Sequence, residues 1–195
     1  MSKYFTNQEI SALLHKFAIG LELKGENRFK IRAYEDLAAT IDHYSSDLYE
    51  LWSEGKLDEV PGVGEHMSEY LNELFSTGKV KHFEQTIHTI NPFVYELDAV
   101  PGIGAKIAFK LVKVLKVNSF KELKKALKQG KLKTLAGFGE KSEKKIALAI
   151  DEYEKTEKRE RMLLYDADRL AQSFIDQVPT NSYIQNIQVL GSIRR

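Results

Sequence analysis

The sequence predicts a mainly α-helical protein, and three observations support this fold class. Apolar residues recur at helical spacing, as Ile10, Leu13 and Phe17 do near the start of the chain. Signals for helix starts are also present, since Thr6-Asn7-Gln8-Glu9 fits a capping box. A strand pattern is convincing only over residues 184–190, so we expect one strand close to the end.

The helices are expected in a regular order. Gly78 is placed as the C-terminal cap of one of them, and Asn91-Pro92 is expected to break the next. A second capping box begins at Ser119, and the last helix is expected to break near Glu157. After the first helix along the chain, the expected helices cover residues 29–41, 48–52, 65–75, 82–90, 107–115, 119–130 and 141–178.

The composition is that of a folded protein without disulfides. Hydrophobic residues make up 43% and aromatic residues 10% of the chain, enough for one large domain or several small cores. Cysteine is absent, which excludes disulfides and thiolate metal sites. The first residues lack the apolar run of a signal peptide, and no window approaches a membrane span. We therefore expect a soluble, cytoplasmic, monomeric protein without a membrane partner.

Charge is distributed very unevenly, although the net charge is only +1. Residues 35–75 contain eleven acidic residues and one basic residue, Lys56. Residues 101–150 contain thirteen lysines against three acidic residues. A lysine-rich segment is what binding to phosphate groups requires, but it is also typical of a solvated helix surface. Charge alone therefore does not decide whether this segment binds nucleic acid.

A short glycine-containing turn occurs three times, twice within the lysine-rich segment. It reads Val60-Pro61-Gly62-Val63-Gly64, then Val100-Pro101-Gly102-Ile103-Gly104, and in a degraded form Leu135-Ala136-Gly137-Phe138-Gly139. Proline fixes φ at the start of the turn, and the two glycines permit left-handed angles and close approach of another molecule. The second glycine opens a helix, whose free N–H groups form an anion site.

We interpret these turns as helix-hairpin-helix motifs that bind the nucleic-acid backbone. The alternative is that each Gly-x-Gly merely starts an ordinary helix, and the recurrence of an apolar residue in the same position favours the binding motif. The second hairpin is expected to bind more strongly than the first, because lysines follow it and glutamates follow the first. The candidate DNA-binding residues are Gly62, Val63, Gly64, Gly102, Ile103, Gly104, Lys106, Gly137, Gly139 and Lys141.

Taken in order, these motifs resemble the amino-terminal portion of a family X DNA polymerase of the bacterial or archaeal, repair type. The resemblance covers essentially the whole chain and rests on Phe29-x-x-x-Ala33-Tyr34, on the hairpins, and on a strand that runs into Gly191-Ser192-Ile193-Arg194-Arg195. It implies a small helical domain with the first hairpin over 1–88 and a fingers-type domain with the other two over 89–154. Residues 155–195 would then be the truncated start of an α/β nucleotidyltransferase palm.

The resemblance also implies ligands. Gapped or nicked DNA would be the partner, and Gly191, Ser192 and Arg195 would hold the phosphates of a deoxynucleoside triphosphate. In the family, catalytic aspartates that hold Mg²⁺ lie on the next strand, beyond Arg195, so we expect these residues not to polymerise DNA by themselves. A monovalent cation, Na⁺ or K⁺, would be held by backbone carbonyls of the hairpins, namely those of Val60, Val63, Val100 and Ile103.

Some relatives also carry a lyase activity in the first domain, for which the resemblance predicts no counterpart here. Their nucleophilic lysine corresponds to Tyr70, and another nearby lysine corresponds to His66. A phenol cannot form a Schiff base, so we expect no lyase activity and a packing role for Tyr70. Lys30 and Tyr34 match positions that help to bind a 5′-phosphate in relatives, although the surrounding acidic residues oppose anion binding.

Two other functions stay open on the sequence. One is a non-catalytic helix-hairpin-helix module of a nuclease, a ligase or a branch-binding protein. This alternative gives no reason for a strand followed by Gly-Ser-x-Arg-Arg. The other is a helical interaction repeat that does not bind nucleic acid, which a binding titration over a series of salt concentrations would identify.

Overall fold

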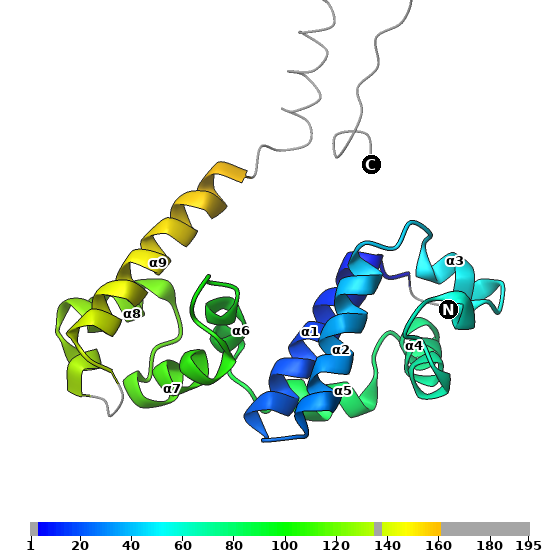
Figure 1. The fold of residues 1–195 in the computed structure, drawn as a ribbon, viewed down its shortest axis with the longest axis horizontal. Helices are drawn as coiled ribbons and strands as arrows, with labels where there is room; N and C mark the ends of the chain where they lie inside the picture. The colour runs from blue at the N-terminus through cyan, green and yellow to red at the C-terminus, as the bar shows by residue number, and fades with distance from the viewer. Residues whose placement is uncertain (1–3, 135–137, 161–195) are drawn as a thin grey trace, which may run out of the picture. The chain divides into compact units, whose positions relative to one another are not determined.

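Helices make up the regular secondary structure of the residues that the computed structural model describes, 4–134 and 138–160 (Figure 1). No strand occurs within these two ranges, in agreement with the predicted fold class. The elements are α1 (Asn7–Leu23), α2 (Arg28–Asp42), α3 (Leu48–Ser53), η1 (Leu57–Glu59), α4 (Glu65–Thr77), α5 (Lys81–Ile87), α6 (Pro92–Asp98), α7 (Ala105–Leu115), α8 (Phe120–Lys128), η2 (Lys131–Thr134) and α9 (Glu140–Glu160). The chain divides into two compact units, Met1–Ala149 and Ile150–Arg195.

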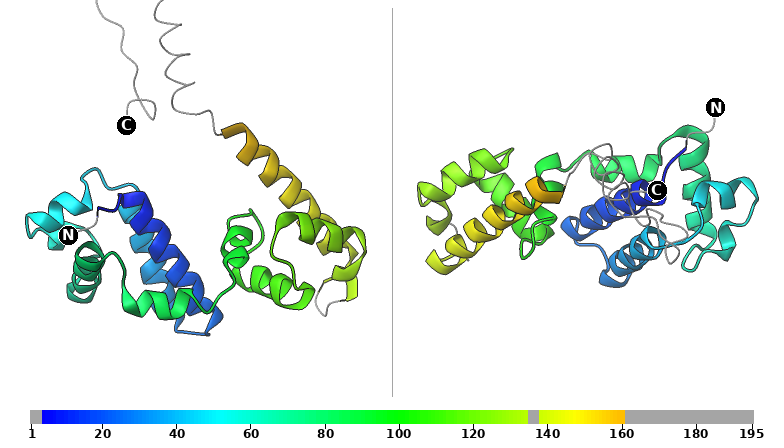
Figure 2. Two further views of the ribbon diagram at one scale, coloured as in Figure 1. Left: turned by 180° about the vertical axis from the view of Figure 1, so that it is seen from behind. Right: turned by 90° about the horizontal axis from the view of Figure 1, so that it is seen from above.

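The first two helices pack side by side, and each begins at a capping side chain (Figures 1 and 2). The capping box predicted at the start of α1 is confirmed: Glu9 N donates to Thr6 Oγ1 at 3.2 Å, and Thr6 N donates to Glu9 Oε2 at 2.9 Å. Asn27 caps α2 by accepting a hydrogen bond from Phe29 N at 2.8 Å. Both helices therefore begin where a side chain satisfies a free N–H group.

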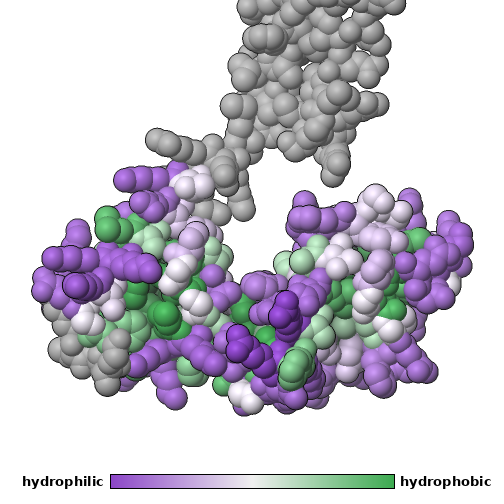
Figure 3. All heavy atoms as spheres, viewed as in Figure 1, coloured by the Kyte–Doolittle hydropathy of each residue, from purple (hydrophilic) through white to green (hydrophobic). Residues whose placement is uncertain are grey.

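An apolar core joins α1 to α5 and includes the first hairpin. Phe17 is fully buried in it and stacks on Phe83, with 4.2 Å between the ring centroids. Val60 and Val63 belong to the same core, so the hairpin is fixed to the helices around it. Hydrophilic side chains cover most of the face shown in Figure 3. The first hairpin is therefore anchored in the apolar core by its two valines.

No helix runs through Asn91-Pro92, as predicted, and the dipeptide also starts α6, which the sequence analysis did not predict. Asn91 Oδ1 accepts a hydrogen bond from Phe93 N at 2.9 Å. Proline suits the first helical position because its nitrogen needs no intrahelical acceptor there. The helix before it, α5, ends at Ile87 and is shorter than predicted.

The helices α6 and α7 pack against each other and hold the second hairpin between them. Leu97 of α6 and Leu111 of α7 are fully buried. The next helix, α8, has part of its predicted capping box: Glu122 N donates to Ser119 Oγ at 3.3 Å. The Glu122 carboxylate accepts from Asn118 N, one residue before the cap, so the second half of the box is displaced.

The last described helix is α9, which crosses from the first compact unit into the second. It is continuous through Glu157 to Glu160, so the break expected near Glu157 does not occur there. The expected continuation to residue 178, the strand at 184–190 and most of the 155–195 segment lie outside the described residues. The predicted domain boundaries after residues 88 and 154 stay predictions.

Candidate nucleic-acid interface

The second hairpin is a tight turn that leads directly into α7. Ile103 N donates a hydrogen bond to Val100 O at 2.9 Å, which closes a four-residue turn with Pro101 at its second position. Gly102 follows at φ +86°, a left-handed angle that L-residues rarely adopt. Proline at the second position and a left-handed glycine at the third are the signature of a type II turn. The sequence Val-Pro-Gly-Ile therefore specifies this backbone conformation directly.

The first hairpin has nearly the same geometry. Val63 N donates to Val60 O at 3.0 Å, and Gly62 adopts φ +87°. A Cβ built on Gly62 would lie 3.3 Å from Leu37 Cδ1 of α2, whereas one built on Gly102 would meet no atom within 4 Å. The two turns therefore share their backbone and differ in what packs behind the glycine.

The second glycine of each hairpin has a different task from the first. Gly64 and Gly104 are the N-caps of α4 and α7, with φ of −89° and −82° and no side-chain capping hydrogen bond. The left-handed angles that glycine permits are therefore used by the first glycine of each hairpin and not by the second, because an N-cap takes an extended backbone. A Cβ at either position would meet no atom within 4 Å. The first turns of α4 and α7 thus have no side-chain cap, and the Cβ position of each N-cap glycine is open.

The apolar residue between the two glycines anchors each turn. The Val63 side chain is 6% exposed and the Ile103 side chain 1% exposed. Neither side chain is available to a ligand, so both predicted DNA-binding residues offer only backbone atoms. Burial also holds the following N–H groups in a fixed direction, which is the preorganisation that an anion site requires.

Lysines surround the second hairpin. A groove of about 400 Å³ lies along α7 and the start of α9, both within the first compact unit. Lys106, Lys110 and Lys145 line it from the two helices. Lys110 Nζ lies 5.0 Å from the ring centroid of Phe138, the residue between the two glycines of the third hairpin. The full lining is Gly102, Lys106, Ile107, Lys110, Phe138, Ser142, Lys145 and Ile146. The groove therefore joins the second hairpin to the third.

The third hairpin is described only in part. Gly137 lies outside the described residues, whereas Gly139 accepts a hydrogen bond from Glu143 N at 3.1 Å at the start of α9. A Cβ on Gly139 would meet no atom within 4 Å, as at the other two N-caps. Lys141 is exposed on the first turn of α9. The predicted residues of this copy that can be placed thus lie at an open helix start.

Acidic side chains surround the first hairpin. Glu65, Glu69 and Glu73 follow it at intervals of four residues along α4; Glu65 and Glu69 are exposed and Glu73 is half-buried. His66 lies 3.7 Å from the Glu69 carboxylate, and its side chain is 93% exposed. These carboxylates oppose the approach of a phosphate that the backbone of the turn would favour.

The predicted 5′-phosphate residues lie in a packed aromatic cluster and an exposed ion pair. The Tyr34 ring contacts Phe17 edge-on at 4.9 Å between centroids, and partial burial raises the pKa of its hydroxyl. Lys30 Nζ lies 3.8 Å from Glu26. Tyr70 stacks on His82 at 5.6 Å and packs against the first core, which confirms its predicted packing role.

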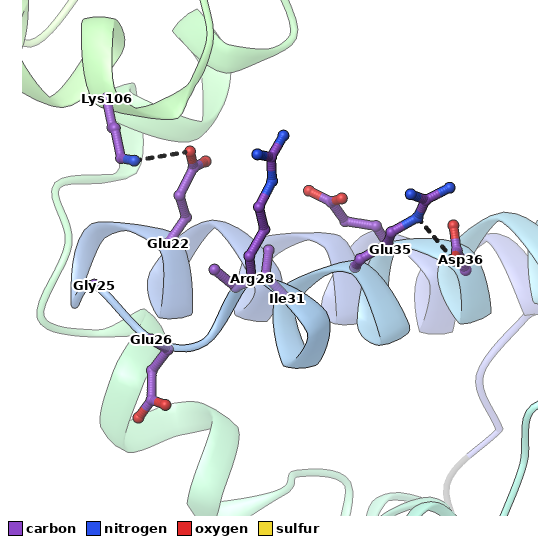
Figure 4. Close-up of a pocket in the computed structure, with 9 residues that line it drawn as sticks. Glu22, Gly25, Glu26, Arg28, Ile31, Glu35, Asp36 and Lys106 are labelled. Atoms are coloured by element: carbon purple, nitrogen blue, oxygen red, sulfur yellow. Dashed lines mark ion pairs between the residues drawn. The ribbon is translucent and has the colours of Figure 1, made fainter.

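A charged pocket near the second hairpin was missed by the sequence analysis (Figure 4). Arg28 and Arg32 of α2, Glu22 of α1 and Lys106 of α7 line it together, within the first compact unit. Lys106 Nζ lies 3.6 Å from Glu22 Oε1. The spacing of four residues between the arginines places them on one helix face, a signal that the sequence contains. The partnership with Lys106 joins residues 84 positions apart and has no such signal.

The hairpin carbonyls fit a monovalent cation in one respect. Val60 O and Val100 O each accept one hydrogen bond in their turns, which leaves one lone pair on each oxygen.

Within the described part of the chain, no group of three or more His, Asp or Glu residues is arranged to hold a metal ion. None of the described helices is long and apolar enough to cross a membrane. The predicted nucleotide-binding residues Gly191, Ser192 and Arg195 lie outside the described residues.

Comparisons with known proteins agree with this arrangement of hairpins. Residues 5–80 match a family model described as a helix-hairpin-helix domain, and residues 94–152 match one described as a SAM-like helix-hairpin-helix tandem. The chain is 32% identical over 188 residues to a Bacillus subtilis protein named DNA polymerase/3'-5' exonuclease PolX. The match covers 96% of this chain and 32% of that protein, so the chain spans about a third of its relative's length. The chain therefore contains helix-hairpin-helix domains and is similar in sequence to a part of a protein named as a DNA polymerase.

Proposed function

We propose that this chain binds the phosphate backbone of DNA through its hairpins, as the DNA-binding part of a family X DNA polymerase. The observation that carries the proposal is the start of α7, where an N-cap glycine without a side-chain cap adjoins a groove lined by three lysines. Free N–H groups and the helix dipole attract an anion, and the lysines add salt-dependent attraction to neighbouring phosphates. Backbone contacts of this kind do not read base sequence.

The substrate proposed is gapped or nicked duplex. Gly64 and Gly104 are 40 residues apart and belong to separate hairpins, each with its own open helix start. Two separate anion sites suit the two backbone segments that flank a break. Na⁺ or K⁺ at the carbonyls of Val60, Val63, Val100 and Ile103 would add a positive charge beside each bound phosphate.

The polymerase activity itself is proposed for a longer protein that contains this chain. Its support is the relationship to a protein whose name includes DNA polymerase. In that protein we propose that Gly191, Ser192 and Arg195 hold the phosphates of a deoxynucleoside triphosphate, through backbone N–H, hydroxyl and guanidinium groups. Mg²⁺ bound by carboxylates of the longer protein would supply two-metal phosphoryl-transfer chemistry.

A binding experiment tests the proposal. Purified chain is titrated into fluorescent intact, nicked and gapped duplexes and single-stranded DNA, at several salt concentrations. We expect the tightest binding to gapped or nicked duplex, with log K falling linearly as log salt rises. Equal affinity for all four DNAs would contradict the proposed substrate, and absence of salt-dependent binding would contradict DNA binding altogether. The non-polymerase module would be favoured if a longer protein lacked metal-binding aspartates after Arg195.

We further propose that the first domain has no lyase activity. Tyr70, which replaces the family's nucleophilic lysine, is packed against His82 and Phe83. Incubation with an abasic 5′ end followed by borohydride should trap no adduct, whereas Tyr70→Lys should gain one. A strong native signal that Lys30→Ala abolishes would show that Lys30 is the nucleophile instead.

A further inference from the structure

We propose that Glu22 is an intramolecular competitor of DNA for Lys106, and that a phosphate group must displace its carboxylate to engage this lysine. The inference rests on the proposed function and adds a regulation of the same site. Glu22 lies on α1, which packs against α2 beside the first hairpin, whereas Lys106 follows the second hairpin on α7. A residue of α1 would therefore set the affinity of the second hairpin.

Lys106 stands where two cavities meet. On one side it lines the groove with Lys110 and Lys145, where a phosphate would find three ammonium groups. On the other side it lines the charged pocket, and its Nζ reaches Glu22 Oε1 at 3.6 Å (Figure 4). A lysine stem is flexible, so its ammonium can turn toward either cavity. The Lys106 ammonium attracts a phosphate less strongly while it is paired with the Glu22 carboxylate than when it is unpaired.

The Lys106–Glu22 pair is weak enough to be displaced. The Lys106 side chain is 74% exposed and the Glu22 side chain 35% exposed. Water therefore screens this pair, and exposed pairs of this kind contribute little. A phosphate at the start of α7 gains the helix N–H groups as well as the lysine, so it has more partners than the Glu22 carboxylate has.

Arg28 offers Glu22 a second partner after displacement. Its guanidinium lines the same pocket and lies on the same side of the helices as the Glu22 carboxylate (Figure 4). Among the described residues, Arg28 forms no ion pair within 4.0 Å. Release of Lys106 therefore need not leave the Glu22 carboxylate without a cation nearby.

A second ion pair also joins α1 to the helices that flank the second hairpin. His15 Nε2 on α1 lies 3.3 Å from Asp98 Oδ2 on α6. His15 precedes Glu22 by seven residues, so the two side chains lie on one face of α1. This pair does not involve Lys106, and we expect it to persist when DNA displaces Glu22. The exchange thus concerns one lysine and does not require α1 to separate from α6.

The test compares two matched charge removals, Glu22→Gln and Glu26→Gln. Both residues line the same pocket, but the Glu26 carboxylate points away from Lys106 (Figure 4) and pairs with Lys30. We expect Glu22→Gln to tighten binding to a gapped duplex at low salt by about twofold to fivefold, the range of an exposed ion pair. Glu26→Gln should change affinity less. In a Lys106→Met background, Glu22→Gln should have no effect.

The outcomes separate the inference from the proposed function. Suppose that the native chain binds gapped DNA and that both glutamine variants gain the same affinity over it. The gain is then a general effect of removing negative charge, and the inference is wrong. A gain from Glu22→Gln that persists in Lys106→Met also contradicts it. If neither the native chain nor any variant shows salt-dependent binding while all remain helical by circular dichroism, both the proposed function and the inference fail.

Discussion

The first and second hairpins have one backbone conformation in two opposite electrostatic surroundings. Their closing hydrogen bonds measure 3.0 and 2.9 Å, and Gly62 and Gly102 adopt φ of +87° and +86°. Yet α4 continues from its hairpin with glutamates at 65, 69 and 73, whereas α7 continues with lysines at 106, 110 and 113. The turn sets where the helix N–H groups point, and the following helix decides whether an anion is attracted.

This difference separates the two contributions to an anion site. Helix N–H groups act within the first turn and are the same at both hairpins. Side-chain charges act over a Debye length of about 10 Å at 0.1 M salt, so they govern approach. A hairpin whose helix N–H groups are well placed but whose neighbouring side chains are acidic should therefore bind phosphate weakly. Replacing those acidic side chains by lysines should strengthen the binding.

The largest effect is expected from Gly104→Val. Gly104 has an ordinary φ of −82° and open space around its Cβ position, so valine should leave the fold intact. The added side chain would stand between the first turn of α7 and a bound phosphate. We expect affinity for gapped DNA to fall by about 1–3 kcal/mol, the value of a charge-assisted hydrogen bond. A binding titration and a thermal melt of the same variant measure the two effects.

Gly64→Val is the matched control, since Gly64 is also an open, extended N-cap. Its loss of affinity should be smaller, because the acidic side chains of α4 already weaken phosphate binding there. A larger loss at Gly64 than at Gly104 would reverse the ranking of the two hairpins. A lowered melting temperature for Gly104→Val would show that the space around it is needed for folding.

The second prediction concerns stability and compares Gly62→Ala with Gly102→Ala. Each substitution places a Cβ at a left-handed angle, at a cost of about 1–2 kcal/mol of folding free energy. Gly62→Ala should cost more, because its Cβ would lie 3.3 Å from Leu37 Cδ1, whereas that of Gly102 meets no atom within 4 Å. Urea unfolding of both variants measures the difference. Equal losses would mean that Leu37 moves aside freely.

Several of these features could be predicted from local sequence. Four consecutive residues, Val-Pro-Gly-Val or Val-Pro-Gly-Ile, are enough to predict the type of each turn. Four residues that begin at Thr6 are likewise enough to predict the capping box. The role of the second glycine could not be read in the same way, because glycine is compatible with both left-handed and extended angles. Only the structure distinguishes Gly102 from Gly104.

The least predictable features depend on residues far apart in the chain. Glu22–Lys106 and His15–Asp98 each join α1 to a helix of the second hairpin, across more than eighty residues. Helical periodicity states which face of α1 a residue occupies, but not which helix will cover that face. The start of α6 at Pro92 was not predicted for another reason, since proline both ends helices and begins them.

The third prediction concerns the salt dependence of binding. Lys145 lines the groove beside the second hairpin, whereas Lys113 lies outside it, with Nζ 5.5 Å from the centroid of the Phe109 ring. Lys145→Met should lower the slope of log K against log salt by about 0.9, the value of one lost phosphate contact. Lys113→Met removes the same charge and should change the slope less. If Lys113→Met has the larger effect, the phosphate backbone follows a different face of α7.

The smallest effect is expected from the His15–Asp98 pair, which links the two compared regions. The hydrogen bond to Asp98 raises the pKa of His15 above its usual value, with Glu35 of α2 adding to the rise and desolvation opposing it. A raised pKa in the folded state stabilises the protein below the unfolded value of about 6.5, and this stabilisation is lost as pH rises through the folded pKa. Native protein should therefore exceed Asp98→Asn in stability by more at about pH 6 than at about pH 8. Because the His15 side chain is 54% exposed, solvent screens the interaction, and the difference in stability should be smaller than the free-energy changes predicted above.

An NMR titration of the His15 ring gives its pKa directly. A pKa that Asp98→Asn leaves unchanged would show that the two side chains do not interact in solution.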